Sequence, residues 1–151
     1  MTFPVQIPSL SPAETEQVGR MLAEQMLTDP SLPPFVALYG DLGVGKTAFV
    51  RGVASVLCPG AAVRSPTFAL VNEYRGKLPI FHFDMYRITD EDDLYSIGYD
   101  DYLLRDGVIL VEWSENIPYA LPERYLRVVI GKNDPNTPDS REILMEEVTS
   151  C

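Results

Sequence analysis

The passage from an apolar segment into a glycine-rich loop and then a helix constrains this chain more than any other feature. Residues 35–39 (FVALY) form a continuous apolar run, which is typical of a strand buried on both faces of a parallel sheet. The next eight residues, GDLGVGKT at positions 40–47, match the pattern G-x-x-x-x-G-K-[ST]. Glycines let the backbone turn its N–H groups inward around an anion, and the helix predicted at residues 46–57 adds the positive end of its dipole. The sequence therefore predicts a phosphate-binding loop in an α/β fold.

The remaining segments are predicted to complete one domain over residues 1–151. Ser11, Pro12 and Glu14 form a capping-box pattern that predicts a helix over residues 12–27. Residues 89–104 are acidic and predicted to be mostly helical, with a break at Gly98. Strands are predicted at residues 2–7, 35–39, 67–74, 79–84, 108–112, 125–130 and 142–148, and a linker at residues 132–140. This order predicts a P-loop NTPase-like three-layer α/β sandwich with a mixed parallel and antiparallel sheet.

Charge and composition exclude several classes of protein. The chain has 151 residues with 22 acidic and 12 basic side chains, so its formal net charge is −10. A chain this acidic is repelled by phosphate backbones and anionic lipid, so we expect contact with tRNA only through a partner and none with a membrane. Two cysteines make no disulfide framework, and no signal-peptide pattern is present, so we expect a cytoplasmic protein. We also expect the chain to be a monomer when alone.

The loop supplies most of the ligands that a nucleotide needs. The backbone is expected to surround the phosphates at four positions, Leu42, Gly43, Val44 and Gly45. Lys46 can reach the β- and γ-phosphates, and the Thr47 hydroxyl can coordinate Mg²⁺. We therefore expect ATP and Mg²⁺ as the bound groups.

Such a loop also needs an acid at the end of a neighbouring strand. Two strands end in this way, IFHFD at residues 80–84 and VILVE at residues 108–112. A strand-ending acid at an ordinary turn is common, but two of them after a phosphate loop favour a catalytic role. We assign Glu112 to the metal, directly or through water, and expect Asp84 to orient the attacking water or to support the metal from further out.

Three other features have both structural and functional interpretations. Trp113 is expected to be a half-buried anchor near the loop, with fluorescence that responds to nucleotide. His82, the only histidine, is more readily explained as an interior residue with satisfied hydrogen bonds than as a catalytic base. The segment Ser65-Pro66-Thr67 lies where a P-loop protein senses the γ-phosphate, but it is also an ordinary proline turn.

Four sequence elements together resemble those of the bacterial TsaE (YjeE) family. The loop GDLGVGKT resembles that family's GDLGAGKT, and the SPTF at residues 65–68 resembles its SPT[FY] element. The HFDMYR at residues 82–87 and the Glu112-Trp113 pair resemble its HxDxYR and EW elements. The order and approximate spacing are also the same, over roughly residues 11–113.

This resemblance implies a specific function. TsaE proteins are small cytoplasmic ATPases needed to form threonylcarbamoyladenosine at position 37 of tRNAs that read ANN codons. They act with the TsaD–TsaB pair, do not modify tRNA themselves, and hydrolyse ATP weakly unless regulated by that complex. The resemblance assigns the phosphates to Lys46, Mg²⁺ to Thr47 and Glu112, and a role in hydrolysis to Asp84. It also implies a switch-like segment at residues 65–68 and adenine contacts from Thr15 and Arg141.

Three other functions fit the sequence less well. A small-molecule kinase would need cationic side chains in a lid, and residues 89–104 contain no Arg or Lys. A GTP-driven switch would need an Asn-Lys-x-Asp segment, which is lacking because Lys132-Asn133-Asp134 has the wrong order. A nucleotide sensor without activity is disfavoured by the intact lysine, threonine and acids. Eight acids against two bases in residues 84–106 either dock a basic partner or form a solvated surface.

Overall fold

A seven-stranded mixed sheet forms the centre of the molecule. The computed structural model describes residues 1–41, 43–66 and 70–150. The strands run in the order β1-β7-β6-β2-β5-β4-β3, in which β6, β2, β5 and β4 are parallel to one another and the outer neighbours pair antiparallel. Their bounds are β1 Val5–Ser9, β2 Phe35–Tyr39, β3 Val71–Tyr74, β4 Ile80–Asp84, β5 Val108–Glu112, β6 Arg124–Asp134 and β7 Thr137–Thr149.

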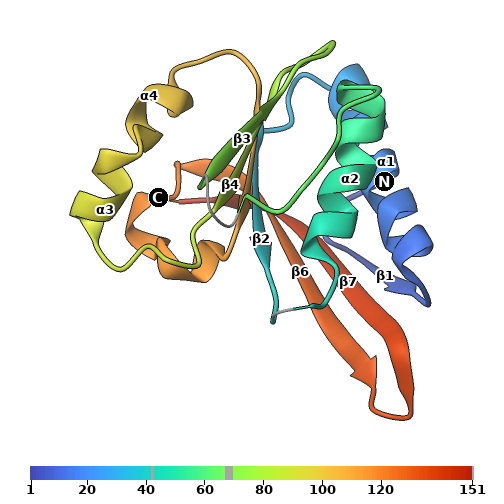
Figure 1. The fold of residues 1–151 in the computed structure, drawn as a ribbon. Coiled ribbons are helices and arrows are strands. Elements are labelled where there is room, and N and C mark those ends of the chain that lie inside the picture. Colours follow the sequence, from blue (N-terminus) through green and yellow to red (C-terminus); the bar gives the residue numbers. More distant parts are fainter. Residues whose placement is uncertain (42, 67–69, 151) are drawn as a thin grey trace.

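Helices cover both faces of this sheet, which makes three layers (Figure 1). The two long helices, α1 (Pro12–Thr28) and α2 (Lys46–Leu57), lie side by side on one face. The other face is covered by α3 (Glu91–Ser96), α4 (Tyr99–Leu103) and two 3₁₀ turns, η1 (Ser114–Asn116) and η2 (Pro118–Ala120). The predicted fold class, a single α/β domain with a mixed sheet, is confirmed.

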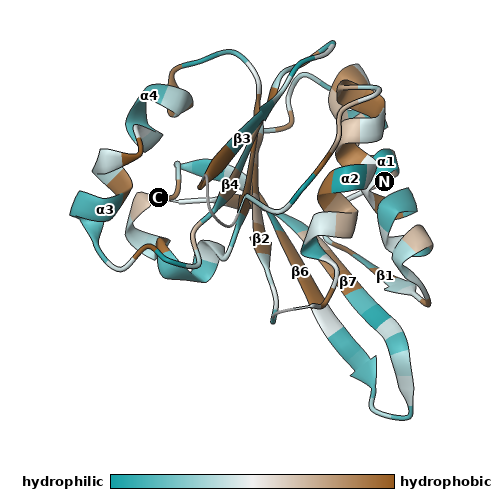
Figure 2. Ribbon diagram, viewed as in Figure 1, coloured by the Kyte–Doolittle hydropathy of each residue, from teal (hydrophilic) through white to brown (hydrophobic). Residues whose placement is uncertain are grey.

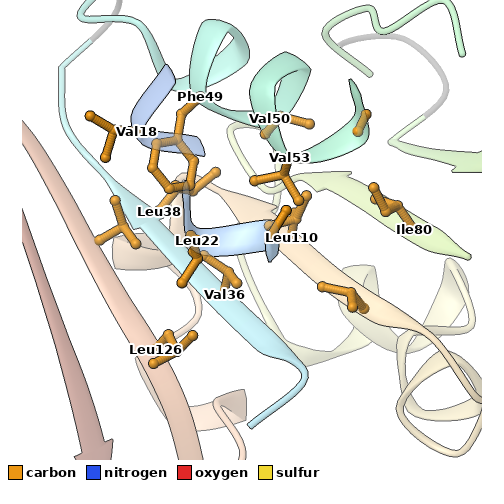
Figure 3. Close-up of a cluster of buried hydrophobic side chains, with 14 of the residues drawn as sticks. Val18, Leu22, Val36, Leu38, Phe49, Val50, Val53, Ile80, Leu110 and Leu126 are labelled. Atoms are coloured by element: carbon orange, nitrogen blue, oxygen red, sulfur yellow. The ribbon is translucent and has the colours of Figure 1, made fainter. Parts of the chain in front are cut away.

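The core follows from the alternation of side chains along each strand. In β2, Val36 and Leu38 point toward α1 and α2, whereas Phe35 and Ala37 join the cluster under α3 and α4. Figure 3 shows Val36 and Leu38 packed against Leu22 of α1 and other side chains of the first cluster. Because both faces of β2 are covered, the strand must be apolar at every position, which explains its continuous run of hydrophobic residues.

The elements around the loop have nearly the bounds that the sequence predicts. The structure places β2, α2 and β5 at the predicted residues, and α1 ends one residue later than predicted. At its start, the Ser11 hydroxyl accepts a hydrogen bond from the Glu14 N–H at 3.2 Å. The acidic segment forms α3 and α4 with Gly98 between them, in a left-handed conformation at φ 75°. No helix of the described residues is long and apolar enough to cross a membrane.

The C-terminal part differs from the prediction. Residues 132–140 do not form a linker: β6 continues to Asp134, β7 begins at Thr137, and the two pair as a long antiparallel hairpin with an irregularity between Lys132 and Asp134. The end of this hairpin extends beyond the sheet and is hydrophilic (Figure 2). Strands that extend beyond the core need no apolar face. Their Asn, Asp and Pro residues therefore resemble those of a linker, although the segment is a hairpin. The first strand also begins three residues later than predicted, and residues 67–69 of the predicted third strand lie outside the described residues.

Candidate active site

The predicted site residues meet at one edge of the sheet. Since β2, β5 and β4 are parallel neighbours, their carboxyl ends lie together. The glycine-rich loop follows β2, Glu112 is the last residue of β5, and Asp84 is the last residue of β4. Asp84 and Glu112 are direct partners in the strand register. This is the edge at which open α/β sheets bind their ligands.

The loop conformation depends on its glycines. Gly40, Gly43 and Gly45 all have positive φ angles, at 144°, 80° and 115°. Gly40 is also confined by its surroundings, because a Cβ atom there would lie 2.5 Å from the backbone oxygen of Ile130. Leu42 lies outside the described residues. The described part of the loop curves around the start of α2, as a phosphate-binding loop does.

Lys46 is held by two contacts at the start of α2. Its Nζ atom donates a 2.5 Å hydrogen bond to the Gly40 carbonyl and lies 3.7 Å from the centroid of the Trp113 ring. Burial lowers the pKa of this ammonium group, while Glu115, Glu112 and Asp84 act in the opposite direction. The lysine therefore brings a positive charge to a place where anionic phosphate would stabilise it.

The Thr47 hydroxyl and the Glu112 carboxylate lie close together, as a shared metal site requires. Thr47 Oγ1 is 3.4 and 3.3 Å from the two carboxylate oxygens, and the glutamate is 4% exposed. Hydroxyl and carboxylate oxygens are hard ligands that suit Mg²⁺. Among the described residues, no cluster of three or more His, Cys, Asp or Glu side chains forms a complete protein cage for a metal. Mg²⁺ is usually held by one or two protein groups together with phosphates and water, so Thr47 and Glu112 could supply the protein's share of its ligands.

Asp84 is a buried carboxyl group beside this pair. Burial raises its pKa, the hydrogen bond from the Tyr86 N–H lowers it, and nearby Glu112 raises it further. A carboxyl group with a raised pKa is a better proton acceptor than an ordinary aspartate. Its position at the end of β4 allows the role in water activation that the sequence suggested.

His82 is a member of this site that the sequence analysis described only as an interior residue. The ring is fully buried, and its two nitrogens lie 3.1 Å from the Tyr74 hydroxyl and 2.5 Å from the Glu112 carboxylate. The expectation of a satisfied interior histidine is thus confirmed. Its contact with Glu112 was missed, although a signal existed: His82 and Asp84 are two residues apart and so share one face of β4.

Lys46, Thr47, Asp84 and Glu112 border a hollow of about 430 Å³. Its lining also contains Ser65, Tyr86 and Trp113. Trp113 is half-buried, as expected, and its ring packs against Tyr86 with 5.0 Å between centroids. Of the predicted switch-like segment, Ser65 borders the hollow and Pro66 is buried, whereas Thr67 and Phe68 lie outside the described residues.

Thr15 and Arg141, the predicted adenine contacts, also lie next to the loop. Both line a small hollow together with Val44 and Gly45. The Arg141 Nε atom donates a 2.9 Å hydrogen bond to the Val44 carbonyl. The Thr15 hydroxyl is already bonded to Ser9 Oγ at 2.8 Å and is almost fully buried, so its methyl group faces the loop near Gly45.

Comparison with known proteins gives a family for this arrangement. A family model described as "Threonylcarbamoyl adenosine biosynthesis protein TsaE" matches residues 9–143. The chain belongs to the TsaE family. A protein with that name from Bacillus subtilis is 38% identical over 141 residues, covering 93% of this chain and 84% of the relative. One from Haemophilus influenzae is 40% identical over 130 residues, covering 83% and 78%.

A solved structure extends the similarity to the fold. The crystal structure of Bacillus subtilis YdiB has a TM-score of 0.76 against this chain, with 31% sequence identity, and the match covers 99% of this chain and 88% of YdiB. TsaE proteins, by the name of their family, are involved in threonylcarbamoyladenosine biosynthesis. The TsaE match includes Thr15, the loop, both strand-ending acids and Arg141.

Proposed function

We propose that this TsaE-family chain is a Mg²⁺-dependent ATPase whose turnover supports formation of threonylcarbamoyladenosine at position 37 of tRNAs that read ANN codons. One observation supports the ATPase most strongly. The Thr47 hydroxyl, at the end of the glycine-rich loop, and Glu112, at the end of β5, lie 3.3 to 3.4 Å apart beside Lys46. A hydroxyl, an acid and a lysine in this relation are the parts with which P-loop proteins hold a triphosphate.

Each residue has a defined task in this reaction. The loop backbone binds the phosphates, and Lys46 balances negative charge that develops on them. Thr47 and Glu112 would hold Mg²⁺, which would neutralise charge at the phosphate oxygens. Asp84 orients a water molecule whose oxygen attacks the γ-phosphorus while the bond to the ADP oxygen breaks. The raised pKa of Asp84 favours its accepting the proton of that water.

The transfer to tRNA is assigned to partners. We propose that the chain acts with TsaD- and TsaB-type proteins, of which TsaD carries out the carbamoyl transfer, and that this complex regulates ATP turnover. A net charge of −10 disfavours direct binding of tRNA. The acidic α3–α4 layer lies on the opposite side of the sheet from α1 and α2 and is suited to a basic surface of a partner (Figure 1).

A small-molecule kinase remains the alternative, and the chain disfavours it. A kinase lid needs cations that reach the transferred phosphoryl group. Residues 89–104, the segment that occupies the position of a lid in the sequence, have no Arg or Lys. A kinase would convert ATP and an acceptor into ADP and a phosphorylated product, whereas the proposed ATPase releases inorganic phosphate.

Reconstituted threonylcarbamoylation of tRNA tests the proposal. The threonylcarbamoylation of tRNA is reconstituted with purified TsaD- and TsaB-type proteins, with and without this chain, and ATP hydrolysis is followed in parallel. We expect multiple turnovers only with the wild-type chain, and their loss with Lys46→Ala or Glu112→Ala. The exposed Lys77 gives a matched control, since Lys77→Ala removes a lysine away from the loop. Sustained modification without the chain, or with Lys46→Ala at the wild-type rate, would refute the proposal.

A further inference from the structure

A chain of buried and partly buried hydrogen bonds connects the metal-associated acid to the segment before Ser65. It begins at Glu112, whose Oε2 lies 2.5 Å from His82 Nε2. The other ring nitrogen, Nδ1, lies 3.1 Å from the Tyr74 hydroxyl. That hydroxyl accepts a hydrogen bond from the Arg64 N–H at 3.3 Å and lies 3.2 Å from the Arg64 carbonyl oxygen. Two side chains, those of His82 and Tyr74, thus join Glu112 to the backbone of Arg64, next to Ser65.

The direction of the first bond does not depend on the charge of the imidazole. An ionised Glu112 can only accept hydrogen bonds, so His82 Nε2 must donate to it. The single proton of the Tyr74 hydroxyl goes either to Nδ1 or to the Arg64 carbonyl, and in the second case Nδ1 donates a hydrogen bond to the hydroxyl oxygen. In both cases each ring nitrogen of His82 makes a hydrogen bond, and these two bonds fix the orientation of the ring.

The strand pairing explains why these residues meet. Residues 82 and 84 of β4 share one face of the sheet, and Asp84 is paired with Glu112 in β5, so His82 lies diagonally across from Glu112. On the other side of β4, the antiparallel pairing with β3 brings Tyr74 near His82, with 6.0 Å between ring centroids. Both rings are buried, Tyr74 at 7% exposure and His82 at 0%.

Glu112 needs such support because it must hold one orientation. Its carboxylate can rotate about the side-chain bonds, and among the described residues its side-chain hydrogen-bond partners are His82 and Thr47. A hydrogen bond from a buried group to a metal-binding carboxylate fixes its orientation, and loss of such a bond commonly weakens metal binding about 10- to 100-fold. Tyr74 extends this support to the segment that borders the hollow at Ser65.

We propose that His82 is a positioning residue that orients the Glu112 carboxylate for Mg²⁺, and that Tyr74 couples this orientation to the backbone of Arg64. This inference rests on the proposed function, because it assumes that Glu112 serves the metal. It assigns His82 no contact with the nucleotide. Binding of Mg²⁺ with nucleotide therefore stabilises the Arg64 segment through Tyr74, and nucleotide without metal does not.

Two substitutions of His82 separate positioning from general structural damage. In His82→Gln the amide nitrogen takes the place of Nε2 and can still donate to Glu112. In His82→Asn the shorter amide reaches only the place of Nδ1. Calorimetric titration of full-length protein with ADP, at a series of Mg²⁺ concentrations and in EDTA, measures the effect. We expect His82→Asn to raise the Mg²⁺ concentration for half-maximal effect about 10-fold or more, and His82→Gln less than about 3-fold on the same scale. ADP affinity in EDTA is expected to stay at the wild-type value.

Tyr74→Phe tests the second link and keeps the buried ring. We expect faster amide hydrogen exchange at Arg64 in the metal-free protein, and protection of that amide by Mg²⁺ with ADP in wild type but not in the variant. If His82→Asn is too unstable to purify, this variant decides the proposal. Equal Mg²⁺ requirements for His82→Asn and wild type, or unchanged exchange at Arg64 in Tyr74→Phe, would overturn it. A loss of ADP affinity in His82→Asn that is as large in EDTA as in Mg²⁺ would also overturn it.

A reference variant keeps this result apart from that of the proposed function. Glu112→Ala must raise the Mg²⁺ requirement if the carboxylate serves the metal at all. If Glu112→Ala has no effect, the assignment of the metal site is wrong. If Glu112→Ala has its effect while His82→Asn has none, the metal site stands and the positioning role of His82 is refuted.

Discussion

Alanine at Gly40 and at Gly43 should have very different effects, although both glycines lie in the same loop with positive φ. At Gly43, φ is 80° and a Cβ atom would meet nothing within 4 Å, so alanine adds only backbone strain. That strain is about 1 to 2 kcal/mol. At Gly40, φ is 144° and the Cβ would lie 2.5 Å from the Ile130 oxygen and 2.8 Å from Val44 Cγ2. Strain of about 1 to 3 kcal/mol then adds to a clash of about 1 to 3 kcal/mol.

Thermal unfolding of the nucleotide-free variants measures this difference. For a chain of this size, each kcal/mol lowers the unfolding temperature by about 2 to 4 °C. We expect a loss of about 5 °C for Gly43→Ala and about 10 °C or more for Gly40→Ala. Binding of ATP should weaken in both, because the strained backbone would relax away from the conformation that surrounds the phosphates. Equal unfolding temperatures for the two variants would refute the described packing of the loop against β6.

Two further predictions concern the acid and the tryptophan of the site. Burial raises the pKa of Asp84 in the folded state, so stability is lost as the pH rises through that pKa and the group becomes charged. Asp84→Asn should therefore be more stable than wild type in urea unfolding at neutral pH, and this gain should vanish below the ordinary pKa of aspartate; a gain that persists in acid would contradict the reasoning. Trp113 fluorescence should change when ATP draws Lys46 from the ring face, and the response should be absent in Lys46→Ala; the same response in both would contradict it.

The part of the fold around the loop could be predicted because its signals are local. The apolar run of β2 lies between the two helical layers, and the glycines with Lys46 and Thr47 follow it directly. The strand-ending positions of Asp84 and Glu112 could also be predicted, because each acid directly follows a short, mostly apolar run in the sequence. Parallel strands bring such ends together, so adjacency could be inferred without knowing the strand order.

The parts that sequence reasoning missed depend on pairing between distant segments. The spacing of His82 and Asp84 gives only the face of β4 on which His82 lies. That His82 reaches Glu112 and Tyr74 reaches His82 depends on the registers of β3, β4 and β5, which the sequence pattern does not give. The end of the β6–β7 hairpin was mistaken for a linker because its residues, such as Asn133 and Pro138, are exposed on strands that leave the core. Asn, Asp and Pro are common in turns, but here the same residues lie on exposed parts of strands.

A crystal structure of the chain with ADP and Mn²⁺, in which the anomalous signal of manganese locates the metal, tests the central claim most directly. The account predicts one peak within coordination distance of the Thr47 hydroxyl, with Glu112 bound to it directly or through one water molecule and the β-phosphate inside the loop of residues 40–47. A metal peak away from Thr47 and Glu112, or phosphates outside the loop, would contradict the account.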